Sequence, residues 1–174
     1  MEPEKILFFW QRVSSLSFAR FQCIKRAHEI YPQSKIEIIT DEDVMPTWVD
    51  ITPINPVREA VREKYGSDVA DSFMQLSDYT RVEWLVKNPY SLYLDTDAYL
   101  LQRLNLESRM ACANGIYCIW SGGDGKVISE CFEKHRNGKQ ILYDFSRCLI
   151  LNGARNIDEQ ILHKEKNIKK FLNI

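Results

Sequence analysis

Residues 76–101, LSDYTRVEWLVKNPYSLYLDTDAYLL, join an amphipathic helix to a short apolar strand that ends in two carboxylates. Residues 72–87 place apolar side chains three and four positions apart, which predicts a helix with one face in the core. Asn88 and Pro89 end that helix, because the residue before a proline disfavours helical backbone. The apolar run at 91–94 then predicts a buried strand of an α/β sheet.

Asp95 and Asp97 follow this strand directly. If the strand continues, side chains two positions apart point the same way, so the two carboxylates converge. Converging anions at the rim of a core repel each other unless a cation, a basic side chain or water offsets the repulsion. Carboxylate oxygens are ligands that Mg²⁺ and Mn²⁺ prefer, and these ions often also bind substrate phosphates. The alternative interpretation of Asp-Thr-Asp is a polar turn that closes the strand.

Asp78 and Arg81 lie three positions apart in the predicted helix and therefore share one of its faces. An isolated pair of this kind adds only about 0.2 to 0.5 kcal/mol to helix stability. Two interpretations stay open at this point. The pair is either a solvated surface ion pair, which contributes little, or part of a binding site.

Taken together, SDYTR at 77–81 and LYLDTD at 92–97 resemble a family, the sugar-binding glycosyltransferases with a DxD motif. That family includes yeast-type initiating mannosyltransferases, bacterial capsular polysaccharide enzymes and the glucosylating clostridial toxins. Its hallmark is Ser-Asp, two residues, Arg, a helix, Gly-Gly, and a hydrophobic strand that runs into Asp-x-Asp. The chain departs from it in one place, since Pro89-Tyr90-Ser91 replaces the Gly-Gly turn.

The resemblance implies a role for each matching residue. Asp97 would be the direct ligand of Mn²⁺ or Mg²⁺, and Asp95 would lie between the metal and the ribose or donor sugar. Asp78 and Arg81 would contact the donor sugar, since a carboxylate accepts from hydroxyls and a guanidinium offers a fork of donors. The family's first strand usually ends in a tryptophan that packs on the nucleotide base, and here this is Trp10. The alternative for Trp10 is a core or rim aromatic.

The fold class that we expect is α/β and GT-A-like, with a mostly parallel central sheet flanked by helices. Residues 1–174 would form a near-minimal single glycosyltransferase domain. Apolar periodicity and turn residues predict the remaining elements. The predicted strands are 5–10, 35–39 and 115–120, and the predicted helices are 17–31, 57–65, 126–135 and 157–172. The helices at 17–31 and 72–87 would turn Phe18 and Phe73 toward the core.

The last predicted helix combines apolar residues with a basic cluster, Lys164, Lys166, Lys169 and Lys170. Such an amphipathic pattern could give peripheral contact with an anionic membrane or a partner, although an ordinary surface helix has the same pattern. His163 lies in the same segment. Some glycosyltransferases place a late histidine near the metal, but periodicity does not fix the direction of this side chain.

Length and composition narrow the class of protein. The chain has 174 residues, of which 45% are hydrophobic, enough for one full-sized core but with little room for a separate acceptor domain. Its 23 basic and 24 acidic residues are intermixed, so no overall field would attract nucleic acid. Five cysteines without C-x-x-C spacing favour a reducing cytoplasm. No apolar run approaches membrane-spanning length, so we expect neither a signal peptide nor a transmembrane segment.

The resemblance implies a metal-dependent, retaining glycosyltransferase that moves a hexose from a nucleoside diphosphate sugar, UDP- or GDP-hexose, to an unknown hydroxyl acceptor. A phosphatase of the haloacid dehalogenase type is the first alternative, because it also places Asp-x-Asp after an apolar strand. Asp95 would then be the nucleophile and Asp97 the acid/base. That class typically has Thr or Val at the position of Ala98 and a pair of acidic residues later in the chain. Here Asp124 and Asp144 are each without a neighbouring acidic residue. The second alternative is an inactive sugar-nucleotide-binding module.

Overall fold

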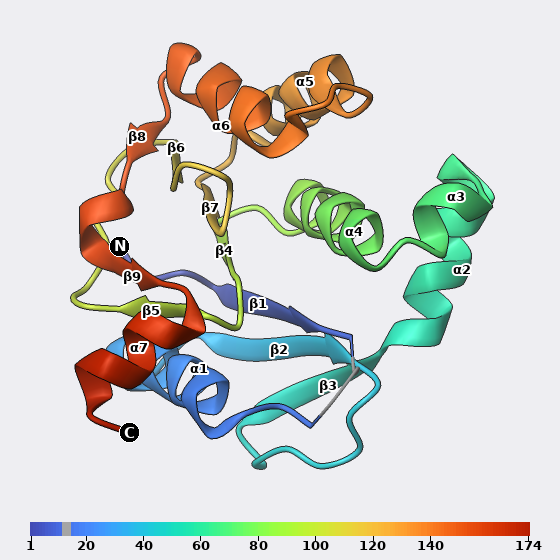
Figure 1. Cartoon of the computed structure of the whole chain (residues 1–174). Helices are drawn as coiled ribbons and strands as arrows, with labels where there is room; N and C mark the ends of the chain where they lie inside the picture. The colour runs from blue at the N-terminus through green and yellow to red at the C-terminus, as the bar shows by residue number, and fades with distance from the viewer. Residues whose placement is uncertain (12–14) are drawn as a thin grey trace.

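The central element of the fold is a seven-stranded sheet with the order β3-β2-β1-β4-β7-β6-β8 (Figure 1). The computed structural model describes residues 1–11 and 15–174. Strands β3, β2, β1 and β4 run parallel, β7 is antiparallel to both β4 and β6, and β8 is parallel to β6. The predicted mostly parallel sheet is therefore confirmed. Its strands are β1 (Lys5–Trp10), β2 (Lys35–Thr40), β3 (Val49–Pro53), β4 (Ser91–Leu94), β6 (Met110–Cys112), β7 (Cys118–Ser121) and β8 (Arg155–Asn156).

Helices cover both faces of this sheet (Figure 1). Alternate residues of β1 point to opposite faces, so Ile6 and Phe8 join the core under α1 while Leu7 and Phe9 join the core under α4. All four are buried, which explains why β1 reads as a continuous apolar run. Helix α1 (Phe18–Ile30) covers the first face, and the second face carries α2 (Ile54–Tyr65), α3 (Ser67–Ala70), α4 (Phe73–Lys87), α5 (Gly125–His135) and α6 (Ile141–Leu151).

The two helix starts that frame the site follow their sequence signals. The hydroxyl oxygen of Ser17 accepts from the Arg20 N–H at 3.2 Å and caps α1, and Ser72 caps α4 in the same way through Gln75. The expectation that Phe18 and Phe73 face the core is wrong, since they are 65% and 48% exposed. Each is the first residue of its helix, directly after the cap.

A second, two-stranded sheet overturns the prediction of a continuous terminal helix over 157–172. Strand β5 (Ala98–Leu100) pairs antiparallel with β9 (Ile161–His163), and a 3₁₀ turn at Asp158–Gln160 precedes β9. Helix α7 begins only at Glu165 and ends at Leu172. The local apolar spacing was compatible with a helix, but pairing with a strand far away in the sequence decides the backbone here.

Helix α7 rests on α1 through Ile168, which is fully buried beside Ala19 and Cys23. Part of the apolar pattern that suggested a membrane contact is thus used for packing within the molecule. Phe171 and Ile174 remain 58% and 55% exposed, and peripheral membrane contact stays a prediction. Among the described residues, none of the helices combines the length and apolar character that crossing a bilayer requires.

Two turns next to the site depart from the sequence expectation. Tyr90 adopts φ +58°, so a tyrosine takes the left-handed conformation that a glycine would supply in the family's Gly-Gly turn. Residues 115–117 were predicted as strand, but Gly115 and Ile116 also have positive φ, +80° and +54°, and β7 begins at Cys118. The turn at 115–117 brings backbone groups next to the end of β4.

Candidate functional site

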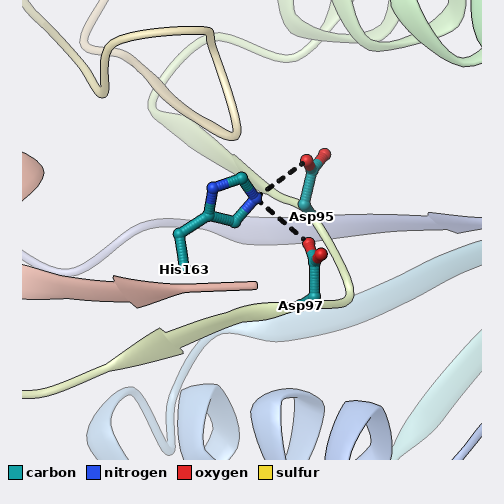
Figure 2. A group of neighbouring side chains, drawn as sticks. All are labelled: Asp95, Asp97 and His163. Carbon is teal, nitrogen blue, oxygen red and sulfur yellow. Dashed lines mark ion pairs between the residues drawn. The ribbon is translucent and has the colours of Figure 1, made fainter. Parts of the chain in front are cut away.

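The Asp-Thr-Asp motif lies in a tight turn at the carboxyl end of β4. The Ala98 N–H donates to the Asp95 carbonyl oxygen at 3.0 Å, which closes the turn, and the Asp95 N–H donates to the Tyr117 carbonyl oxygen at 2.8 Å. The strand thus does not continue through the motif, and strand alternation is the wrong reason for the two carboxylates to converge. They converge nevertheless, because the turn folds Asp97 back beside Asp95 (Figure 2).

His163 completes a group of three side chains that could hold a metal ion (Figure 2). Its Nε2 lies 3.3 Å from Asp97 Oδ1 and 3.8 Å from Asp95 Oδ2, and one ligand atom from each residue lies within 4.8 Å of the others. His163 arrives through the β5–β9 pairing, in which it faces Ala98 directly. Two carboxylate oxygens and one imidazole nitrogen suit Mn²⁺, and these three side chains leave coordination positions for water or phosphate.

The two carboxyls of this group differ in their electrostatics. Burial raises the pKa of Asp97, but the hydrogen bond and charge of His163, together with the charge of Arg20, outweigh burial and hold that pKa below its usual value. Burial also raises the pKa of Asp95, and here the charge of Arg81 and the hydrogen bond from Tyr93 do not compensate, so the pKa stays above its usual value. Asp97 is therefore the carboxylate that this environment favours in the charged form.

Asp78 and Arg81 are both buried, with 6% and 5% of their surface exposed, so the solvated surface pair is wrong. Arg81 Nη2 lies 3.2 Å from Asp78 Oδ1, and Nη1 lies 3.3 Å from Asp95 Oδ1. Nη1 also donates to the Ile116 carbonyl oxygen at 2.9 Å, and the guanidinium stacks on Tyr93 at 4.3 Å. The Arg81 guanidinium thus forms ion pairs with two carboxylates, those of Asp78 and Asp95. Burial raises the pKa of Asp78 to about 6, with Arg81 lowering it and Asp95 raising it further.

Trp10 lies half-buried at the end of β1, and Arg20 from α1 packs over it, with its Cζ 4.8 Å from the ring centroid. Arg20 also donates from Nη1 to the Thr96 hydroxyl at 2.7 Å and from Nε to Glu165 at 3.0 Å. Its Nη2 lies 3.8 Å from Asp97 Oδ2. Arg20 therefore ties the first strand, the turn and α7 together. No motif or spacing in the sequence marks Arg20 for this position.

One cavity of about 440 Å³ brings together all five side chains that the sequence singled out. They are Trp10, Asp78, Arg81, Asp95 and Asp97. The cavity opens at the carboxyl ends of β1 and β4, the edge of an α/β sheet where ligands usually bind. A second cavity of about 210 Å³, between α2 and α4, contains none of these five residues.

Tyr117 orients the histidine of the candidate metal group. Its ring stacks on the His163 imidazole with centroids 3.9 Å apart and an interplanar angle of 14°. The Tyr117 hydroxyl donates to Asp158 Oδ1 at 2.7 Å, which fixes the ring on its outer side. The Tyr117 carbonyl oxygen also holds the backbone of Asp95, as described above. Tyr117 thus acts on two members of the group without being a ligand atom itself, and sequence reasoning did not identify it.

Substitution Tyr117→Leu should weaken Mn²⁺ binding about tenfold, since outer partners of a metal ligand typically contribute that much to affinity. Tyr117→Phe keeps the stack on His163 and loses only the bond to Asp158, so we expect a smaller loss. Titration of the free Mn²⁺ signal by electron paramagnetic resonance measures both affinities. Equal affinities in the wild-type and Leu proteins would show that the stack does not hold the imidazole.

Comparison with known proteins shows the fold class. The sequence matches no protein-family model and no curated protein. Among solved structures, PaToxG Glycosyltransferase is similar over 87% of this chain and 71% of its own, with 13% identity and a TM-score of 0.53. A structure described as a transferase is similar over 94% of this chain and 93% of its own, with 12% identity and a TM-score of 0.59. The fold is thus the GT-A-like α/β fold of glycosyltransferases, as the sequence motifs implied.

Proposed function

We propose that this chain is a metal-dependent glycosyltransferase that moves a hexose from a nucleoside diphosphate sugar to a hydroxyl acceptor. One observation carries the proposal: Asp95 and Asp97, which form a possible metal site with His163, line the same cavity as the buried Asp78–Arg81 pair. The desolvation free energy of two buried charges offsets most of the attraction between them, so stability alone does not explain the pair and a binding role accounts for it better. The fold is one that solved glycosyltransferases share.

Asp95, Asp97 and His163 would hold Mn²⁺ or Mg²⁺ in this proposal. When bound, such an ion neutralises charge on the diphosphate leaving group. Asp78 would accept hydrogen bonds from hydroxyls of the hexose and Arg81 would donate to them, while Arg81 also pairs with Asp78 and Asp95.

Trp10 would stack on the base of the nucleotide, as a large rigid ring at a strand end can do. Its indole N–H is buried and has no hydrogen-bond partner among the residues that the structure describes. We further propose that residues 1–174 form one glycosyltransferase domain and that the transfer retains the anomeric configuration. We also propose that the protein is cytoplasmic. All five cysteines are free, in line with a reducing compartment.

Thermal unfolding in the presence of UDP-glucose or GDP-mannose, each with and without Mn²⁺, tests the proposed function. A donor at 100 times its dissociation constant should add about 2.7 kcal/mol of stability, and removal of Mn²⁺ should abolish most of that gain. The same samples should slowly release free hexose from the nucleotide sugar that binds. Hydrolysis of an aryl phosphate without any effect of nucleotide sugars would instead support a phosphatase. Binding without turnover, with many acceptors supplied, would support an inactive binding module.

A further inference from the structure

The cavity that Asp95 and Asp97 line also has an apolar part. Charged side chains come from α1, from the second and third turns of α4, and from the turn after β4. The first turn of α4 contributes Phe73 and Met74 instead, and α6 contributes Leu142. We call the uncharged side chains of Phe73, Met74 and Leu142 the apolar wall of this cavity.

The apolar wall begins one helical turn away from the proposed sugar contacts. Met74 precedes Asp78 by four residues, so both lie on the same face of α4, separated by about 6 Å along the axis. Gly115 also lines the cavity, next to Ile116, whose carbonyl oxygen accepts from Arg81. A Cβ on Gly115 would lie 3.7 Å from Cε1 of Tyr143, so the aromatic ring of Tyr143 lies beside Gly115.

The side chains of this part are unusually exposed for their type. Met74 and Phe73 of the apolar wall have exposed fractions of 66% and 48%. Large apolar side chains that gather at the mouth of a cavity typically mark a binding surface. A carbohydrate would bring several hydroxyl groups here that need hydrogen-bond partners once they leave water. Phenylalanine and leucine side chains offer no such partner, and a thioether is only a weak acceptor.

We propose that the acceptor is an alcohol with an apolar body, aryl or alkyl. Its hydroxyl reaches the polar part of the cavity, and its body rests against Phe73, Met74 and Leu142. This inference rests on the proposed function, because it concerns the second substrate of that reaction. In the transfer, the bond between the anomeric carbon and the diphosphate oxygen breaks, the bond between that carbon and the alcohol oxygen forms, and the hydroxyl proton is released to water.

The test compares 2-phenylethanol and 1-octanol with maltose and glycerol as acceptors for UDP-glucose or GDP-mannose in the presence of Mn²⁺. We expect kcat/KM to be at least about tenfold higher for 2-phenylethanol than for maltose. Met74→Gln and Leu142→Gln keep the size of the side chain but add an amide, and each should raise KM for 2-phenylethanol about tenfold with little change in kcat. Leu151→Gln is the control, since Leu151 is 78% exposed at the other end of α6 and lies outside the cavity lining.

Hydrolysis of the donor by water, measured in the wild-type protein without acceptor, tests the proposed function separately from the proposed class of acceptor. If hydrolysis occurs but maltose accepts better than the apolar alcohols, the acceptor class is wrong and the proposed function stands. If neither the Met74 nor the Leu142 substitution changes KM for 2-phenylethanol, the apolar wall does not bind the acceptor and the inference is equally overturned. A protein that neither binds nor hydrolyses nucleotide sugars would overturn both.

Discussion

Replacing Asp97 by asparagine should abolish metal-dependent hydrolysis of the donor and lower Mn²⁺ affinity at least about a hundredfold, because a ligand should contribute more than the outer partners of a site. The substitution removes a charge with hardly any change of volume. Asp97 is the carboxylate whose pKa lies below its usual value, so the folded protein favours its charged form. Its Oδ1 lies 3.3 Å from His163 Nε2, within the group that also contains Asp95.

Metal-dependent hydrolysis and Mn²⁺ titration, run side by side, check this prediction. Circular dichroism should show a retained fold, since the asparagine amide fits the same turn. Asp71→Asn is a matched control, because Asp71 also pairs with an arginine, Arg62 at 2.9 Å, but lies 58% exposed and outside the cavity. Mn²⁺-stimulated hydrolysis at the wild-type rate in the Asp97→Asn protein would remove this residue from the metal site.

The second large effect is on stability. Arg81→Met should lower the free energy of unfolding by about 3 to 5 kcal/mol, because it leaves buried carboxylates without their positive partner. Arg81 is 5% exposed and lies within 3.3 Å of carboxylate oxygens of both Asp78 and Asp95. Arg81→Lys keeps the charge but not the planar fork, so its loss should be smaller.

Urea denaturation followed by tryptophan fluorescence measures these differences. Arg62→Met provides the comparison, since Arg62 also contacts two carboxylates, but it is only half-buried and those of Glu59 and Asp71 are 66% and 58% exposed. We expect it to change the unfolding free energy far less than Arg81→Met, because solvent screens exposed ion pairs. Equal losses of unfolding free energy in Arg81→Met and Arg62→Met would mean that burial does not determine how much the Arg81 ion pairs contribute to stability.

The features that the sequence predicted well depend on contacts close along the chain. Ser72 at the start of α4 and Asn88 at its end are local signals, and both match the structure. The buried strand at 91–94 follows from an apolar run between a proline break and two aspartates. The shared face of Asp78 and Arg81 follows from helical spacing alone. These elements position four of the five predicted site residues, namely Asp78, Arg81, Asp95 and Asp97.

The features that it could not predict depend on pairing between distant segments. Strand β9 forms against β5, with some sixty residues between them, and this pairing delivers His163 to the two aspartates. Arg20 reaches Thr96 across 76 positions, and Tyr117 reaches Asp158 across 41. The spacing of apolar residues along the chain carries no information about such long-range contacts. For this reason the sequence predicted a helix over residues 157–163. Tyr90 in a left-handed turn is a further case, because local preference would place glycine there.

Anomalous diffraction from a crystal grown with Mn²⁺ and UDP or GDP would locate the metal and the nucleotide. We expect a manganese peak within about 2.5 Å of carboxylate oxygens of Asp95 and Asp97 and of His163 Nε2. The diphosphate should complete the coordination, and the nucleotide should lie in the cavity with Trp10 against its base. A nucleotide bound away from Asp78 and Arg81, or manganese held by other residues, would contradict the account.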